Sequence, residues 1–143
     1  MEFYYMSCKV IELSVSAEKD MMLIIRMTTA GVLSRAGLTL DDIDDMKIAV
    51  DEACTCLMTQ KMRYGRLSLR YEYDADGACV RIAGLDGQSQ TENCGIDDQD
   101  EEILRCILNS MASEVTIRRD CESITEIEMK KRSAKAGVAA YGG

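Results

Sequence analysis

The 143-residue chain contains no histidine and no tryptophan, and it has a single phenylalanine. Without histidine, no imidazole is available as a general base or as a metal ligand, so both kinds of site are excluded. The seven cysteines include no C-x-x-C pair, and Cys54 and Cys56 would point to different sides of a helix. We therefore predict no structural zinc site and no other metal site.

Basic charge and long apolar runs are also scarce. Lys and Arg total 17 against 25 Asp and Glu, which gives a formal net charge of −8. This charge argues against direct binding of nucleic acid, because the backbone phosphates would be repelled. No apolar run approaches the roughly 18–20 residues that a membrane-spanning helix needs, and the N-terminal residues lack the pattern of a secretion signal. We expect a cytoplasmic protein without membrane contacts, and unpaired cysteines within apolar segments suit that reducing compartment.

What the sequence does contain is enough apolar material for one folded domain. Hydrophobic residues make up 47% of the chain, and its length is typical of a single core. The last residues are rich in Ala and Gly. We predict one domain over residues 1–132 and a flexible tail over residues 133–143.

Hydrophobic periodicity predicts eight elements in the order strand, helix, helix, strand, strand, helix, strand, strand. The predicted strands are 3–15, 66–73, 78–82, 115–119 and 123–132, and the predicted helices are 17–36, 40–60 and 100–112. Residues 84–99 are predicted to form a loop. Because hairpins dominate, the economical fold is a two-layer α/β sandwich of the α+β class. A mixed, mainly antiparallel sheet would carry the three helices on one face.

Several local signals mark the ends of these elements. Ser16 and Thr39 are predicted N-caps of the first two helices, and Gly37 is predicted to end the first of them. Residues 74–77 read Asp-Ala-Asp-Gly, which is typical of a hairpin turn.

The helix at 40–60 carries two residues that could belong to a site. Ile43, Met46, Val50, Ala53 and Leu57 recur at helical spacing and predict its buried face. Glu52 and Cys56 lie four residues apart on another face, where they could line a cleft. Taken alone, the pattern also fits a solvated carboxylate and a small packing residue, and this alternative stays open.

The segments 26–37 and 45–56 together resemble the anti-sigma-factor serine kinases, a branch of the GHKL (Bergerat-fold) ATPases. In that family an R-x-T-x-x-G-V-x-x-R-x-G helix precedes a D-x-K-I-A-V-x-E-A-C-T-N helix, and both patterns are present here except for the final Asn. The resemblance implies that Glu52 corresponds to the general base. It also implies that Cys56 stands where an Asn binds the Mg²⁺ that carries ATP.

The other nucleotide-binding elements implied by the resemblance are also altered. The family's D-x-G motif, which binds adenine, corresponds to residues 84–86, where Gly84 replaces the Asp and Asp86 replaces the Gly. A two-residue slip could bring Asp86 into the pocket, although a simple turn at Asp86 and Gly87 explains the same residues. The family's Gly-rich phosphate cradle corresponds to residues 100–106, which contain no glycine.

Acidic residues surround these positions. Between residues 86 and 102 the chain has seven carboxylates and no Lys or Arg: Asp86, Glu92, Asp97, Asp98, Asp100, Glu101 and Glu102. Such a run would oppose a triphosphate, since it places like charges where the phosphates would bind.

We interpret the chain as a regulatory protein with a degenerate ATP site and no expected cofactor, acting by protein–protein binding. The resemblance implies a sigma factor or an anti-anti-sigma (STAS-type) protein as partner, and it implies a possible homodimer. The alternative is an active Mg-ATP-dependent protein serine kinase, in which Glu52 is the base and Gln60 replaces the missing Mg²⁺ ligand. A third reading is an unrelated α+β domain with a chance motif.

Overall fold

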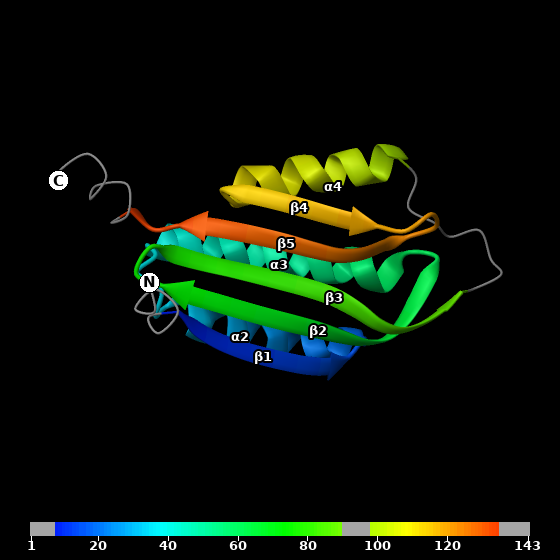
Figure 1. Ribbon diagram of the computed structural model, residues 1–143, viewed down its shortest axis with the longest axis horizontal. Helices are drawn as coiled ribbons and strands as arrows, with labels where there is room; N and C mark the ends of the chain where they lie inside the picture. Colours follow the sequence, from blue (N-terminus) through cyan, green and yellow to red (C-terminus); the bar gives the residue numbers. More distant parts are fainter. Residues whose placement is uncertain (1–7, 90–97, 135–143) are drawn as a thin grey trace.

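The computed structural model describes residues 8–89 and 98–134. Within them, five strands and three α-helices form two layers (Figure 1). The elements are β1 (Lys9–Ser16), the 3-10 turn η1 (Lys19–Met21), α2 (Met22–Leu33), α3 (Leu40–Thr59), β2 (Met62–Asp74), β3 (Gly77–Ser89), α4 (Asp98–Met111), β4 (Glu114–Arg119) and β5 (Ile124–Arg132). The predicted α+β class and element order are confirmed.

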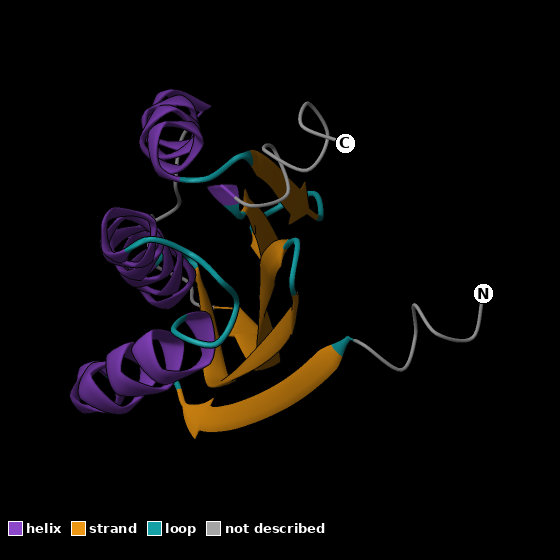
Figure 2. Ribbon diagram, turned by 90° about the vertical axis from the view of Figure 1, so that its left-hand side faces the viewer, coloured by secondary structure: helices purple, strands orange, loops and turns teal. Residues whose placement is uncertain are grey.

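The five strands form one sheet in the order β1-β2-β3-β5-β4. We expected a mainly antiparallel sheet, and all four pairings between the described strands are antiparallel. The three helices cover one face of this sheet, and none of the described helices lies on the other face, as the end-on view shows (Figure 2). α3 lies between α2 and α4, so it has a neighbour on each side.

The core lies between the sheet and the helices because each element buries one side. In β2, Leu67, Leu69 and Tyr71 point inward and are fully buried. The predicted stripe of α3 is confirmed, and all five of its residues are buried: Ile43, Met46, Val50, Ala53 and Leu57. The Tyr71 hydroxyl shares a hydrogen bond of 2.8 Å with the hydroxyl of Thr29 on α2, so the polar end of this buried ring is satisfied.

This other face of the sheet is held by ion pairs between outward-pointing side chains. Arg70 binds Glu12 on β1 and Glu72 on its own strand, at 2.6 and 2.7 Å. Arg81 on β3 binds Glu128 on β5 at 2.8 Å. Alternation of such residues with the buried ones explains why the sheet tolerates water on this side.

Of the three predicted helix signals, only the Thr39 cap is confirmed. The Thr39 hydroxyl accepts a hydrogen bond of 3.1 Å from the N–H of Asp42, so Thr39 caps α3. Gly37 has the left-handed φ of 71° that suits a glycine after a helix, but α2 ends at Leu33 with Ser34 as its C-cap, so the prediction that Gly37 ends this helix was wrong. The prediction for Ser16 was wrong, because Ser16 is the last residue of β1 and the α-helix begins only at Met22, after η1.

The predicted loop at 84–99 was wrong over its first six residues. β3 continues to Ser89 and pairs there with the start of β2, for example Gly87 with Tyr64 and Ser89 with Met62. The glycines and polar residues of this segment suggested a loop, but main-chain pairing with 62–67 keeps it extended. Residues 90–97, which include Glu92 and Asp97, lie outside the described residues.

The predicted boundary of the tail is displaced by at least one residue. Ser133 is buried, its N–H donates to Asp76 O at 2.9 Å, and its hydroxyl donates to Ala75 O at 3.0 Å. It therefore belongs to the fold, and residues 135–143 of the predicted tail lie outside the described residues. No helix in the described part of the chain has the length and apolar character needed to cross a bilayer.

Candidate functional site

The predicted site residues of α3 differ sharply in burial. Glu52 is exposed, whereas Cys56, one turn later, is only 7% exposed. Burial and, to a smaller extent, the nearby carboxylates of Glu101 and Glu52 together raise the pKa of the Cys56 thiol to about 12. The fold therefore brings Glu52 and Cys56 together with the first turn of α4, on the side of α3 that faces α4.

Gln60, which follows the last turn of α3, is 2% exposed and points into the protein. Its side-chain amide makes two hydrogen bonds to the main chain of Ile124 at the start of β5. Nε2 donates to Ile124 O at 2.5 Å, and Oε1 accepts from the Ile124 N–H at 2.8 Å. The oxygen proposed as a substitute Mg²⁺ ligand is thus already used to hold α3 to β5.

Tyr64 on β2 covers the two glycines that the sequence singled out on β3. A side chain on Gly84 would place its Cβ only 2.3 Å from atoms of the Tyr64 ring, and one on Gly87 would lie 3.2 Å from the same ring. The Tyr64 hydroxyl donates to Ile124 O at 2.9 Å, and burial raises its pKa. The ring therefore occupies the space above Gly84, on the side of β3 toward Gln60 and Ile124.

The sequence did not identify Tyr64 as part of this site. Its ring reaches Gly84 and Gly87 only because β2 begins earlier, and β3 ends later, than the hydrophobic pattern indicated. The glycines themselves were the available signal, since a strand glycine often marks the close approach of another group.

Asp86, the candidate for the adenine-binding carboxylate, is exposed. It has a φ of 56°, and it lies opposite Gly65 where the pairing of β2 with β3 is interrupted between Gly87 and Leu85. The register of the two strands is the same on both sides of this interruption, so no residue is inserted, and the left-handed conformation of Asp86 is accommodated opposite a glycine.

The acidic start of α4 is partly neutralised by a residue that the sequence did not connect with it. Glu101, whose side chain is 16% exposed, accepts a hydrogen bond of 2.8 Å from Nη1 of Arg119 at the end of β4. The next residue, Asp120, accepts hydrogen bonds from the N–H groups of Glu122 and Ser123, which lower its pKa. This turn leads directly into Ile124, so it completes the same cluster.

The chemistry available to this cluster is limited. A thiol whose pKa is about 12 carries almost no thiolate near neutral pH, which disfavours Cys56 as a nucleophile. Among the described residues, no group of three or more His, Cys, Asp or Glu side chains could hold a metal ion. What the cluster does provide is a well-packed contact between α3, α4, β2, β3 and β5.

No family model matches this chain. The serine-protein kinase RsbW of Staphylococcus aureus strain bovine RF122 / ET3-1 is 34% identical over 144 aligned positions, which cover 90% of this chain and 89% of the relative. RsbW of strain MRSA252 gives the same values, and RsbW of strain JH9 is 33% identical over the same shares of both chains.

Proposed function

This chain belongs to the family of the serine-protein kinase RsbW, and we propose that it is a regulatory member that acts by binding a partner protein without using ATP. The anti-sigma-factor kinases that its motifs resemble imply a sigma factor or a STAS-type anti-anti-sigma protein as the partner. The proposal places the protein in the cytoplasm, where both kinds of partner act.

The residues present do not fit Mg-ATP. At the position of the Mg²⁺ ligand, Cys56 is buried and protonated, and a sulfur ligand suits Mg²⁺ poorly because this ion prefers oxygen. At the phosphate end, residues 100–106 offer carboxylates in place of glycine N–H groups. Glu101 is engaged by Arg119, which also removes that cation as a free phosphate ligand.

The observation that carries the proposal is the placement of Tyr64. Its ring packs against Gly84, the residue that corresponds to the adenine-binding Asp, and its hydroxyl is bonded to Ile124. An adenine placed there would have to displace a packed aromatic side chain and break its hydrogen bond. In this proposal the fold instead presents a surface to a partner protein.

Thermal unfolding with millimolar Mg-ATP tests the absence of nucleotide binding. A ligand at 100 times its Kd stabilises a protein by about 2.7 kcal/mol. For a domain of this size, that stabilisation raises the Tm by about 5–10 °C. We expect no change for this chain, and RsbW of Staphylococcus aureus measured in parallel supplies the positive control. A shift of several degrees would refute the proposal.

Calorimetry with purified partners tests the binding function. A sigma factor or a STAS-type protein from the same genome should bind saturably in buffer that contains no nucleotide. If neither class binds, or if binding appears only with Mg-ATP, the regulatory proposal is wrong.

An active serine kinase is the second candidate, because Glu52 is retained and exposed at the position of the general base. It predicts transfer of radiolabelled phosphate from ATP to a STAS-type protein. Such transfer should disappear in the variant Glu52→Ala, which leaves the buried residues of α3 intact.

A further inference from the structure

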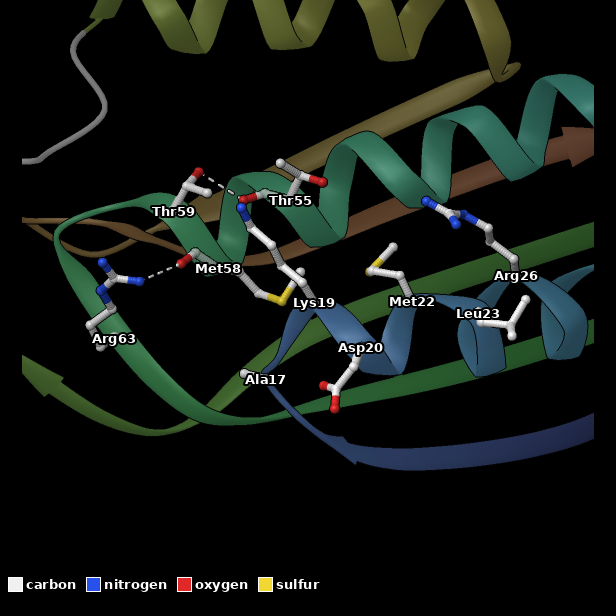
Figure 3. Close-up of a pocket in the computed structure, with 10 residues that line it drawn as sticks. All are labelled: Ala17, Lys19, Asp20, Met22, Leu23, Arg26, Thr55, Met58, Thr59 and Arg63. Carbon is white, nitrogen blue, oxygen red and sulfur yellow. Dashed lines mark hydrogen bonds between the residues drawn. The ribbon is translucent and has the colours of Figure 1, made fainter.

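A separate groove lies on the other side of α3, between η1 and α2 on one wall and the C-terminal half of α3 on the other (Figure 3). Its volume is about 690 Å³, within the range of roughly 300–1,000 Å³ that is usual for small-molecule sites. Cys56, Gln60 and Tyr64 do not line it. It is therefore distinct from the cluster between α3 and α4.

The groove carries more positive charge than its surroundings in this acidic chain. Three cations line it (Lys19, Arg26 and Arg63), against one carboxylate, Asp20. Arg26 is paired with Asp51 at 2.7 Å, so its charge is largely compensated. In the described part of the chain, Lys19 and Arg63 have no carboxylate within ion-pair distance.

The two uncompensated cations approach the C-terminal end of α3 from different elements. Lys19 extends from η1 toward the last turns of α3, and Arg63 lies just beyond those turns at the start of β2 (Figure 3). Nη1 of Arg63 donates to Met58 O at 3.2 Å, which anchors the guanidinium and leaves its other N–H groups for a ligand. A guanidinium held in this way is well suited to a phosphate or carboxylate.

Hydroxyl groups and apolar side chains complete the lining. Thr55 and Thr59 present exposed hydroxyls from α3, and the Thr59 hydroxyl is oriented by donating to Thr55 O at 2.8 Å. Met22, Met58 and Leu23 supply an apolar surface beside them. A mixture of a few polar groups with an apolar wall is typical of sites for small organic ligands.

We propose that this groove binds a small organic anion, with a phosphate or carboxylate group held by Lys19 and Arg63 and an apolar body packed against the methionines. The net charge of −8 argues against a nucleic-acid backbone as the source of the anion, because an acidic protein repels a polyanion. The site depends neither on partner binding nor on the state of the cluster at Tyr64. Its failure would leave the proposed function untouched.

Phenyl phosphate is a suitable probe because it combines both features, and amide chemical shifts locate its site. At about 0.15 M salt, we expect saturable binding with a Kd below about 1 mM and shifts concentrated at Lys19, Thr55 and Thr59. Benzylamine, which has a similar body and the opposite charge, should not bind. Inorganic phosphate should bind more weakly than phenyl phosphate, because it cannot use the apolar wall.

Charge reversal separates this site from general attraction. The double variant Lys19→Glu/Arg63→Glu should weaken phenyl phosphate binding at least about tenfold. The control Arg105→Glu reverses one charge on α4, outside the groove, and should have little effect on binding. Both groove residues are exposed, and the single variant Lys19→Glu provides the test should the double variant unfold. Absence of saturation, equal binding by the reversed variants, or equal binding of inorganic and phenyl phosphate would overturn the proposal.

Discussion

Replacement of Tyr64 tests whether its ring is a packed part of the structure. Tyr64→Phe removes the hydroxyl that donates to Ile124 O, a bond with a net value of about 1 kcal/mol. Ile124 O also accepts from Gln60, so no buried carbonyl loses its last partner, and we expect a loss near 0.5–1 kcal/mol. Tyr64→Ala also removes the ring over Gly84 and Gly87. Removal of a fully buried aromatic ring lowers the free energy of unfolding by about 3–5 kcal/mol. Because the Tyr64 side chain is only partly buried, we expect a loss of about 2–3 kcal/mol.

Urea unfolding measures both losses. Tyr73→Phe on the same strand is the matched control, because among the described residues its hydroxyl has no hydrogen-bond partner, and its effect should stay below about 0.5 kcal/mol. A loss below about 1 kcal/mol for Tyr64→Ala would show that the ring does not fill this space. A rise in the Tm of that variant with Mg-ATP would show that Tyr64 alone had blocked the nucleotide, which contradicts our account of Cys56 and of residues 100–106.

Three further predictions concern other parts of the molecule. Cys56→Asn should not create Mg-ATP binding in calorimetry, since one restored ligand leaves Tyr64 and the acidic start of α4 in place; micromolar binding would mean that Cys56 alone had silenced the site. Lys131→Met should lower the free energy of unfolding, measured in urea, by about 1–2 kcal/mol. The side chain of Lys131 is only 15% exposed; its Nζ donates to Met111 O at 2.8 Å and lies 3.6 and 3.8 Å from the carboxylates of Asp42 and Asp45. The control Lys130→Met, at an exposed position, should change the free energy of unfolding by less than about 0.5 kcal/mol. Burial raises the pKa of Cys54 and Cys56 from 9.0, and that of Tyr71 from 10.0, to about 12, so the folded state keeps protons that the unfolded chain releases. The contribution of these three groups should therefore be constant below pH 9, and stability should fall between about pH 9 and 12, with a shallower fall for Cys54→Ala; unchanged stability from pH 8 to pH 11 would contradict this.

The parts of the fold with strong local signals could be predicted from the sequence. α3 was expected at 40–60 and is observed at Leu40–Thr59, because a regular apolar stripe and the Thr39 cap both specify it. The hairpin turn at 74–77 followed from its residues in the same way. The extension of β3 through Gly84 to Ser89 was missed, because the alternation of side chains is broken at Gly65 and Asp86, and its partner segment 62–65 has no clear pattern either.

The candidate site could be predicted only where it lies on one helix. The grouping of Glu52 and Cys56 followed from their spacing in α3. The contacts of Tyr64 with Gly84, between two strands, and of Arg119 with Glu101, between β4 and α4, join residues 20 and 18 positions apart, and no local pattern specifies such pairs. Because the pairing of Glu101 with Arg119 could not be predicted, the sequence analysis treated all the carboxylates at the start of α4 as unpaired.

The two hydrogen bonds between Gln60 and Ile124 have a consequence for the order of folding. They join positions 64 residues apart, so the chain must close a long loop, at an entropic cost that grows slowly with length, before the amide finds its partner. Until β5 arrives, burial of Gln60 would leave a polar group unsatisfied, which disfavours early docking of the end of α3. The Ile124 N–H should therefore gain its protection from hydrogen exchange late in refolding, together with the closing of the sheet rather than with the helix.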